Sequence, residues 1–186
     1  GFLLFTFIFL NPFARTEEPN YIMDNIQKVI INNITDEVGK LSIVLNESGT
    51  CYNFSDDYGN NYKAVSDENR KYAIYFYPLF NDNTKNTGCD AANYTLGVYS
   101  EEKIVIYDKI IDLKNAYTVY DNLKKSLGIT NDFLFKTKDL VGTEIEELSV
   151  NRNIPQGINV ESREIPIRVI NNSGQIQELI LNIRVW

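Results

Sequence analysis

The first ten residues constrain the fold of this chain more than any other feature. Apart from Gly1 and Thr6, every residue from 1 to 10 is an aliphatic or aromatic hydrophobe. As a helix the segment would be about 15 Å long, about half the thickness of a bilayer's hydrocarbon core, so it cannot span a membrane alone. Asn11 and Pro12 then break the helix, because proline removes a backbone donor and clashes with the preceding turn.

An exposed patch of this kind would aggregate, so we expect the segment to be covered. Three uses are open. The segment is part of a longer membrane anchor, or a β-strand donated to the open sheet of the next subunit, or a helix that packs with copies of itself along a filament axis.

Composition excludes several classes of function. The chain contains no histidine, which removes Ser-His-Asp and Cys-His catalysis and histidine-ligated metal sites. Its 18 Lys and Arg against 25 Asp and Glu give a net charge of -7, which argues against binding to nucleic acid or docking on anionic lipid. We therefore expect no cofactor, no metal ion and no nucleic-acid partner.

Two further observations indicate export. The chain opens on Gly1 without an initiator methionine, which is typical of a processed or trimmed product. Cys51 and Cys89 are an isolated pair in polar, turn-rich stretches, and in an exported protein such a pair most simply forms one disulfide. Two free thiols are the alternative.

Sequons of the form N-x-Ser/Thr point in the same direction. Four fall in predicted loops or strand ends, where a glycan fits, and are candidate N-glycosylation sites: Asn46, Asn53, Asn93 and Asn171. A fifth, at Asn33, falls in a predicted helix and is less suited to a glycan.

Residues 16–48 carry the pattern of a long amphipathic helix. Thr16 supplies a capping hydroxyl, and the acids that follow suit a first helical turn. Apolar residues then recur at steps of three and four, namely Ile22, Met23, Ile26, Val29, Ile30, Ile34, Val38, Leu41 and Leu45. The pattern predicts one helix of about seven turns.

Beyond residue 48 the sequence favours short strands. Runs rich in β-branched and aromatic residues predict strands over 71–78, 94–99 and 103–107, with Glu101-Glu102 as a turn. Residues 116–127 predict a short helix that Gly128 ends, and residues 132–136 predict a further strand.

The C-terminal segment predicts a β-hairpin around the turn 171–174. Apolar residues alternate on both sides of that turn, at Ile165, Ile167 and Val169 and again at Leu179, Leu181, Ile183 and Val185. Pro166 cannot donate a ladder hydrogen bond, so its strand must be at an edge or bulged there.

Together these patterns predict an α+β fold, in which a long N-terminal helix with a hydrophobic tip packs on a β-rich, mostly antiparallel globular head. We place the boundary between residues 1–48, as assembly segment and stalk, and residues 49–186, as an extracellular head domain.

No group of residues forms a catalytic or metal-binding motif. The oxygen-rich stretch 56–61 lacks the spacing of an EF-hand, and Glu144, Glu146 and Glu147 are typical of a solvated face. Tyr72, Tyr75 and Tyr77 could form a sugar-stacking face, but their alternation with apolar residues is typical of an ordinary sheet. We expect the chain not to be an enzyme, with a carboxylate-pair glycosidase as the alternative.

The order of an apolar N-terminal segment, a break at Asn11-Pro12, a long amphipathic helix and a β-rich head resembles type IV pilins, in particular archaeal pilin-like proteins processed by a prepilin-type peptidase. The terminal run 163–186 also resembles the last hairpins of such proteins. The resemblance implies that the apolar helices bundle in a filament core. The assembly residues would then be Phe2, Leu3, Leu4, Phe5, Phe7, Ile8, Phe9 and Leu10.

Two departures from the pilin pattern bear on this resemblance. The family usually has a glutamate at the fifth mature position, where this chain has Phe5, so pairing of that carboxylate with a neighbour's terminal amine does not carry over. The apolar run is also about half the usual length.

We therefore expect a structural subunit of an extracellular, type IV pilus-like filament that forms a helical homo-oligomer and exposes its head for adhesion to an unidentified host or surface ligand. It would touch the membrane only before assembly. The alternatives are a membrane-anchored extracellular binding domain that does not polymerise, and a filament subunit joined by donor-strand complementation.

Overall fold

The computed structural model describes residues 21–46, 62–66, 70–80 and 94–186, with the backbone alone for 62–66. Its first helix is α2 (Tyr21–Ile34), in which Met23, Ile26, Ile30 and Ile34 are buried. Steps of three and four residues place these side chains on one face of the helix, and that face packs into the interior of the protein.

The chain changes from helix to strand between Ile34 and Thr35, and this change overturns the predicted fold class. Strand β1 (Thr35–Leu45) follows α2 directly, so the long N-terminal helix expected over 16–48 is wrong from residue 35 on. Within the described ranges the protein is mainly β with short helices, and not an α+β head on a helical stalk.

The strand forms because its burial repeats every two residues. Leu41 and Leu45 suit a helical stripe, but Ile43 between them is 1% exposed while Val44 is 43% exposed, which is the alternation of a strand. Gly39 also weakens a helix. The backbone of β1 instead pairs on both edges, with β3 (Lys71–Phe76) and β4 (Tyr94–Ile106).

Four antiparallel strands make up one end of the molecule, in the spatial order β2 (Tyr62–Ser66), β3, β1 and β4. We call β1, β2, β3 and residues 94–104 of β4 the strand lobe. The predicted strand at 71–78 is confirmed over 71–76, in β3. The predicted turn at Glu101-Glu102 is wrong, because these residues pair with Gly39 and Val38 inside one long strand, β4.

The remaining elements, together with α2, form what we call the helical lobe. In chain order they are α3 (Tyr107–Ala116), the 3-10 helix η2 (Tyr117–Val119), α4 (Tyr120–Leu127), β5 (Phe133–Lys138), the 3-10 helix η3 (Glu146–Leu148), β6 (Glu161–Ile170) and β7 (Ile176–Val185). The predicted helix end at Gly128 is confirmed, because this residue caps α4 in the left-handed conformation with φ 66°.

The predicted C-terminal hairpin is confirmed in β6 and β7. Ile165 pairs with Leu181 and Ile167 with Leu179, so the alternating apolar residues share one face. Among the described residues, β6 pairs with β4 only at Val169 and Ile170, so at Pro166 it pairs with β7 alone. The prediction that the strand is at an edge or bulged at Pro166 is therefore confirmed, as an edge.

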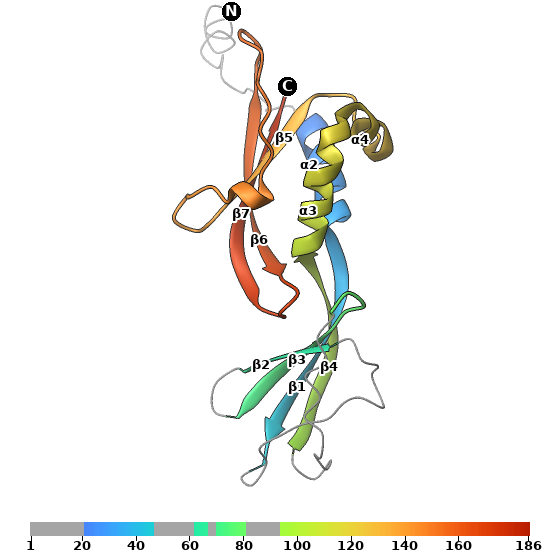
Figure 1. Cartoon of the computed structure of the whole chain (residues 1–186), viewed down its shortest axis with the longest axis vertical. Coiled ribbons are helices and arrows are strands. Elements are labelled where there is room, and N and C mark those ends of the chain that lie inside the picture. The colour runs from blue at the N-terminus through green and yellow to red at the C-terminus, as the bar shows by residue number, and fades with distance from the viewer. Residues whose placement is uncertain (1–20, 47–61, 67–69, 81–93) are drawn as a thin grey trace, which may run out of the picture.

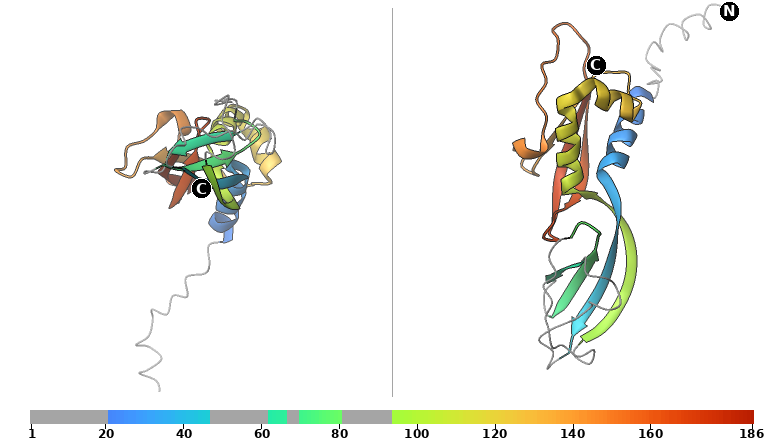
Figure 2. Two further views of the ribbon diagram at one scale, coloured as in Figure 1. Left: turned by 90° about the horizontal axis from the view of Figure 1, so that it is seen from below. Right: turned by 45° about the vertical axis from the view of Figure 1, so that its right-hand side comes forward.

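The two lobes lie end to end and share one seven-stranded sheet, in the order β2-β3-β1-β4-β6-β7-β5 (Figure 1). They meet where β4 runs parallel to β6, at Val105 with Val169 and Ile106 with Ile170. The helices lie beside β5, β6 and β7, and the strand lobe extends away from them as a curved sheet (Figure 2).

The largest hydrophobic cluster lies in the helical lobe, where Ile30 and Ile110 from the helices meet Phe133, Phe135 and Leu181 from the sheet. The described part of the strand lobe has a smaller cluster, formed by Leu41, Ile43, Leu45 and Ile74. Among the described residues, no helix has the length and apolar character needed to cross a membrane.

Candidate functional site

Most of the sequence-predicted site residues lie outside the described part of the chain. These are the assembly residues from Phe2 to Leu10, the break at Asn11 and Pro12, the cysteines at 51 and 89, and the sequons at Asn53 and Asn93. The disulfide, the apolar tip and these two glycosylation sites therefore stay predictions.

Two predicted glycosylation sites are described, and both side chains also have structural partners. Asn46 is exposed at the end of β1, where its Oδ1 accepts a hydrogen bond of 3.2 Å from the Thr95 hydroxyl. Asn171 begins the β6–β7 turn, and its Oδ1 accepts hydrogen bonds from the backbone amides of Ser173 and Gln175, both at 3.0 Å. Glycan attachment at either residue remains a prediction.

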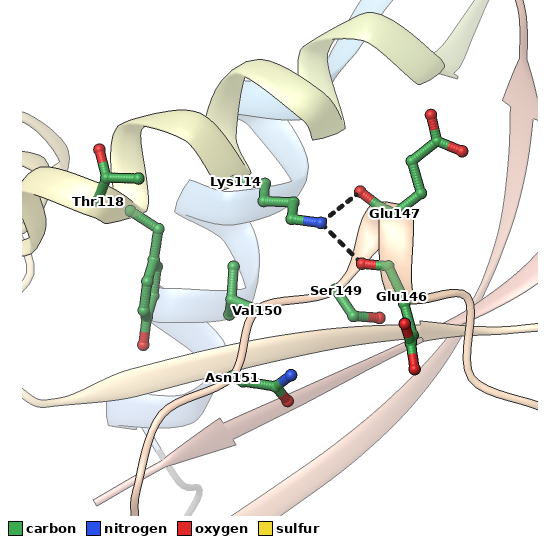
Figure 3. A pocket seen from close by; sticks show the side chains of 8 residues that line it. Lys114, Thr118, Glu146, Glu147, Ser149, Val150 and Asn151 are labelled. Carbon is green, nitrogen blue, oxygen red and sulfur yellow. Dashed lines mark hydrogen bonds between the residues drawn. The ribbon is translucent and has the colours of Figure 1, made fainter.

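A groove of about 620 Å³ lies between α3 and the segment around η3 (Figure 3). Lys114 Nζ donates across it to the carbonyl oxygens of Glu146, at 2.7 Å, and Glu147, at 3.0 Å. The carboxylates of these two glutamates point away from each other in Figure 3, and Glu144 pairs with Lys136 at 2.7 Å. Lys114 thus holds η3 against α3, and the groove does not bring two carboxylates together.

Aromatic residues form a second cluster beside this groove. Tyr120 Oη accepts a hydrogen bond of 2.8 Å from the Phe133 amide, and the Arg152 guanidinium lies 3.8 Å from the centre of the Tyr120 ring. Burial raises the pKa of the Tyr120 phenol, with a smaller contribution in the same direction from Asp132. These contacts tie α4 to β5, so we assign the cluster to stability.

The three tyrosines of the predicted sugar-stacking face do not lie together. Tyr75 and Tyr77 are 5% and 6% exposed and belong to the cluster at the junction of the lobes, whereas Tyr72 packs against the cluster of the strand lobe. The interpretation as ordinary sheet residues is confirmed for Tyr72 and Tyr75, whereas Tyr77 lies just after the end of β3. Among the described residues, no group of acids and cysteines has the arrangement of a metal site.

The feature best suited to a function is an edge of the sheet. Strand β4 pairs with β1 from Tyr94 to Val105, but within the described ranges its other side pairs only with β6, at Val105 and Ile106. We call the side of residues 95–104 that faces away from β1 the open edge. In the right-hand view of Figure 2 the yellow-green β4 ribbon runs along one side of the strand lobe.

Two apolar side chains of the open edge are exposed, Leu96 by 53% and Val98 by 78%. The charged residues of this edge, Glu101, Glu102 and Lys103, follow at its end nearer the helical lobe. The first six residues of the edge, 95–100, therefore offer backbone hydrogen-bonding groups beside an uncharged and partly apolar surface.

The described edges along β5 and β6 are protected. Along β5, the segment 143–150 returns to cover the strand, with Ile145 donating from its amide to Thr137 at 2.8 Å and Val150 to Phe135 at 3.1 Å. Along β6, Pro166 interrupts the edge, and Arg163 reaches Asp24 and Gln27 of α2. Prolines, charges and covering segments are the usual means by which proteins block unwanted strand pairing.

A β-bulge shapes the open edge. The pairing of β1 with β4 shifts between Leu41 and Ile43, so that two residues of β4, Gly97 and Val98, lie opposite Ser42. A Cβ at position 97 would come within 2.9 Å of the Ser42 carbonyl oxygen, which explains the glycine. The sequence did not reveal the edge, because the assumed turn at Glu101 split β4 into two shorter strands.

Comparisons with protein-family models, with curated proteins and with solved structures gave no match to this chain. The resemblance to type IV pilins accordingly stays a prediction, and the function must be argued from the edge itself.

Proposed function

We propose that this chain is a structural subunit of an extracellular filament, and that its subunits join by adding a β-strand to the open edge of β4. The observation that carries the proposal is the contrast between this edge, with Leu96 and Val98 exposed, and the protected edges of β5 and β6.

An unprotected edge is a liability unless a partner strand covers it. Its N–H and C=O groups form a template for a further strand, and natural proteins normally block such templates. Strand addition satisfies these groups with main-chain hydrogen bonds, while side chains such as Val98 supply contacts on the faces of the sheet. The open edge is therefore suited to protein–protein assembly more than to catalysis.

The choice of a filament over a closed dimer rests on the sequence. In addition to the acceptor edge, the chain carries a segment that can form a strand, the Phe-rich residues 2–10. A subunit with one donor and one acceptor joins head to tail, and such contacts produce open filaments when the rotation does not close a ring. The extracellular location rests on the cysteine pair and the sequons.

The test places a charge on the edge. In the full chain, Val98→Lys should abolish filaments seen by negative-stain electron microscopy, because lysine on an edge opposes strand addition. The matched control is Val141→Lys, in a loop residue that is 86% exposed and distant from β4 in the chain. It should leave filaments unchanged, and circular dichroism should show both variants folded.

Two outcomes would contradict the proposal. Filaments of normal abundance from Val98→Lys would show that assembly does not use the open edge. A wild-type chain that stays monomeric at all concentrations would favour the membrane-anchored binding domain that does not polymerise.

A further inference from the structure

We infer that the strand received by the open edge is the segment Phe2–Leu10 of a second copy of this chain, added antiparallel to β4. This inference rests on the proposed function and deepens it by naming the partner. It is argued from the length and chemistry of the edge, and from how far the N-terminal segment can reach.

The donor segment matches the open edge in length. The edge spans residues 95–104, and the segment Phe2–Leu10 has nine residues, so as strands both extend for about 30 Å at roughly 3.3 Å per residue. Pairing would stop at Pro12, because proline has no N–H to give to a ladder. The break that follows the apolar segment thus has a physical role at the end of a donated strand.

The chemistry of the two partners also agrees. The segment 2–10 has no charged side chain and consists of Phe and Leu with Thr6 and Ile8. Phe, Thr and Ile favour strands, and the apolar side chains need to be covered. Residues 95–100 of the edge are likewise uncharged and expose Leu96 and Val98. Pairing would bury apolar surface on both sides without burying a charge along this stretch.

The chain between Leu10 and Tyr21 is too short for the segment 2–10 to pair antiparallel with β4 of its own copy. Antiparallel addition places Leu10 beside Thr95, at the far end of the strand lobe from Tyr21. The 14 residues of α2 and the 11 residues of β1, which run end to end in Figure 1, separate these points by about 55 Å. The chain between Leu10 and Tyr21 spans at most about 40 Å when fully extended.

A parallel donor from the same copy is within reach and is the competing arrangement. It would place Leu10 beside Ile104, which pairs with Asp36 at the start of β1, roughly 25 Å from Tyr21 along α2. We favour the antiparallel arrangement between copies because antiparallel pairing is more stable per residue. It also leaves each copy with one donor and one acceptor.

The first experiment locates the donor by photo-crosslinking in the full chain. A photo-reactive benzoylphenylalanine replaces Phe5 in a protein of natural isotope content (light). This protein is mixed before assembly with an isotope-labelled wild-type protein (heavy). We expect light–heavy crosslinked peptides that contain residues 95–104, identified by mass spectrometry. The same replacement at Phe13, beyond the break, is the matched control and should not give them. Crosslinks to 95–104 confined to single copies would overturn the inference in favour of self-insertion.

The second experiment complements two half-blocked chains. Phe5→Asp removes the donor and keeps the edge, whereas Val98→Lys blocks the edge and keeps the donor. Each variant alone should be monomeric, and an equimolar mixture should give dimers and no filaments in mass photometry. Filaments from Phe5→Asp alone would show that a different segment is donated, which overturns the inference while the proposed function stands. Filaments from Val98→Lys alone would overturn both.

Discussion

The phenol of Tyr99 lies over Gly39, with its Oη 2.7 Å from the position that a Cβ of residue 39 would occupy. Tyr99 pairs with Leu41 on β1, its hydroxyl donates to Glu101 at 3.2 Å, and its ring centre is 6.5 Å from that of Phe76. An aromatic side chain thus fills the space that a glycine leaves in the middle of a strand.

The first prediction compares the two strand-lobe glycines. Gly39→Ala should change stability little, because the blocking atom is the end of the Tyr99 side chain, which is 48% exposed and can turn away. Gly97→Ala should cost about 1–3 kcal/mol, because its blocking atom is the Ser42 backbone carbonyl oxygen, 2.9 Å away, and a bulge must shift. Urea unfolding of both variants measures the difference, and equal costs would contradict the geometry.

The second prediction concerns the stability of the fold at acidic pH. Asp36 accepts from Lys109 at 2.9 Å and from the Tyr77 hydroxyl at 3.0 Å. The hydrogen bond from Lys109 is the main cause that lowers the pKa of Asp36, although burial acts in the opposite direction. A lowered folded pKa contributes stability above the unfolded value of about 4, which is lost as the pH falls through the folded value.

Asp36→Asn should therefore destabilise the chain at pH 7, and the deficit should shrink below about pH 4. Free energies of unfolding at pH 7, 4 and 3 measure this, with Asp112→Asn on exposed α3 surface as the control. A deficit that stays constant over this range would rule out the ion pair as its source.

The third prediction concerns the stability of the fold at alkaline pH. Burial, followed by the hydrogen bond to Asp36, raises the pKa of Tyr77 to about 12. A raised folded pKa means that the neutral phenol contributes stability that is fully present below its unfolded value of about 10 and is lost up to about 12. The wild type should therefore lose stability relative to Tyr77→Phe between these pH values in unfolding titrations. Parallel pH curves for the two chains would refute the assignment.

The fourth prediction tests the groove between α3 and η3. Lys114→Ala removes the lysine donor from the Glu147 carbonyl, whereas the Glu146 carbonyl keeps the Ser149 amide at 3.3 Å. The variant should cost about 0.5–1.5 kcal/mol, with faster amide hydrogen exchange in the segment 143–150. Lys125→Ala, on the exposed face of α4, is the control and should cost less than about 0.5 kcal/mol. Unchanged exchange in Lys114→Ala would show that the lysine does not hold η3.

The fifth prediction compares neighbouring asparagines in the β6–β7 turn. Asn171→Ala removes an acceptor used by Ser173 and Gln175 and should cost about 1–2 kcal/mol. Asn172→Ala removes one hydrogen bond, of 2.8 Å to Asp108, and should cost less. Thermal unfolding ranks the two variants, and a larger effect at residue 172 would contradict the role of Asn171 in the turn.

Local patterns were sufficient to predict the C-terminal hairpin. Ile165 and Ile167 alternate with polar neighbours, and the stretch from Asn171 to Gly174 has the residues that turns require. Both signals depend on neighbours in the chain, so sequence alone determined this part of the fold, together with the helix end at Gly128 and the strand β3.

Only the tertiary structure decided whether residues 35–45 form a helix or a strand. The four-residue step from Leu41 to Leu45 suits a helix and a strand alike, and the three-residue step from Val38 to Leu41 favours a helix, so the sequence pattern could not identify the strand. The strand prevails because β3 and β4 satisfy both edges of β1. Those partners lie about 30 and 60 residues away in the chain, and no local pattern reports them.

The open edge of β4 has the same origin. The sequence shows which residues form the edge, 95–104, but whether they are covered depends on where β6 lies. Among the described residues, β6 pairs with β4 only at Val105 and Ile106, and Arg168 of β6 reaches Glu102 at 3.5 Å. Sequence alone therefore determined that this chain carries an apolar segment in need of cover and lacks the histidines on which much catalysis depends. The tertiary structure added an edge that can receive a strand, because hydrogen bonding across a sheet is a relation between segments far apart in the chain.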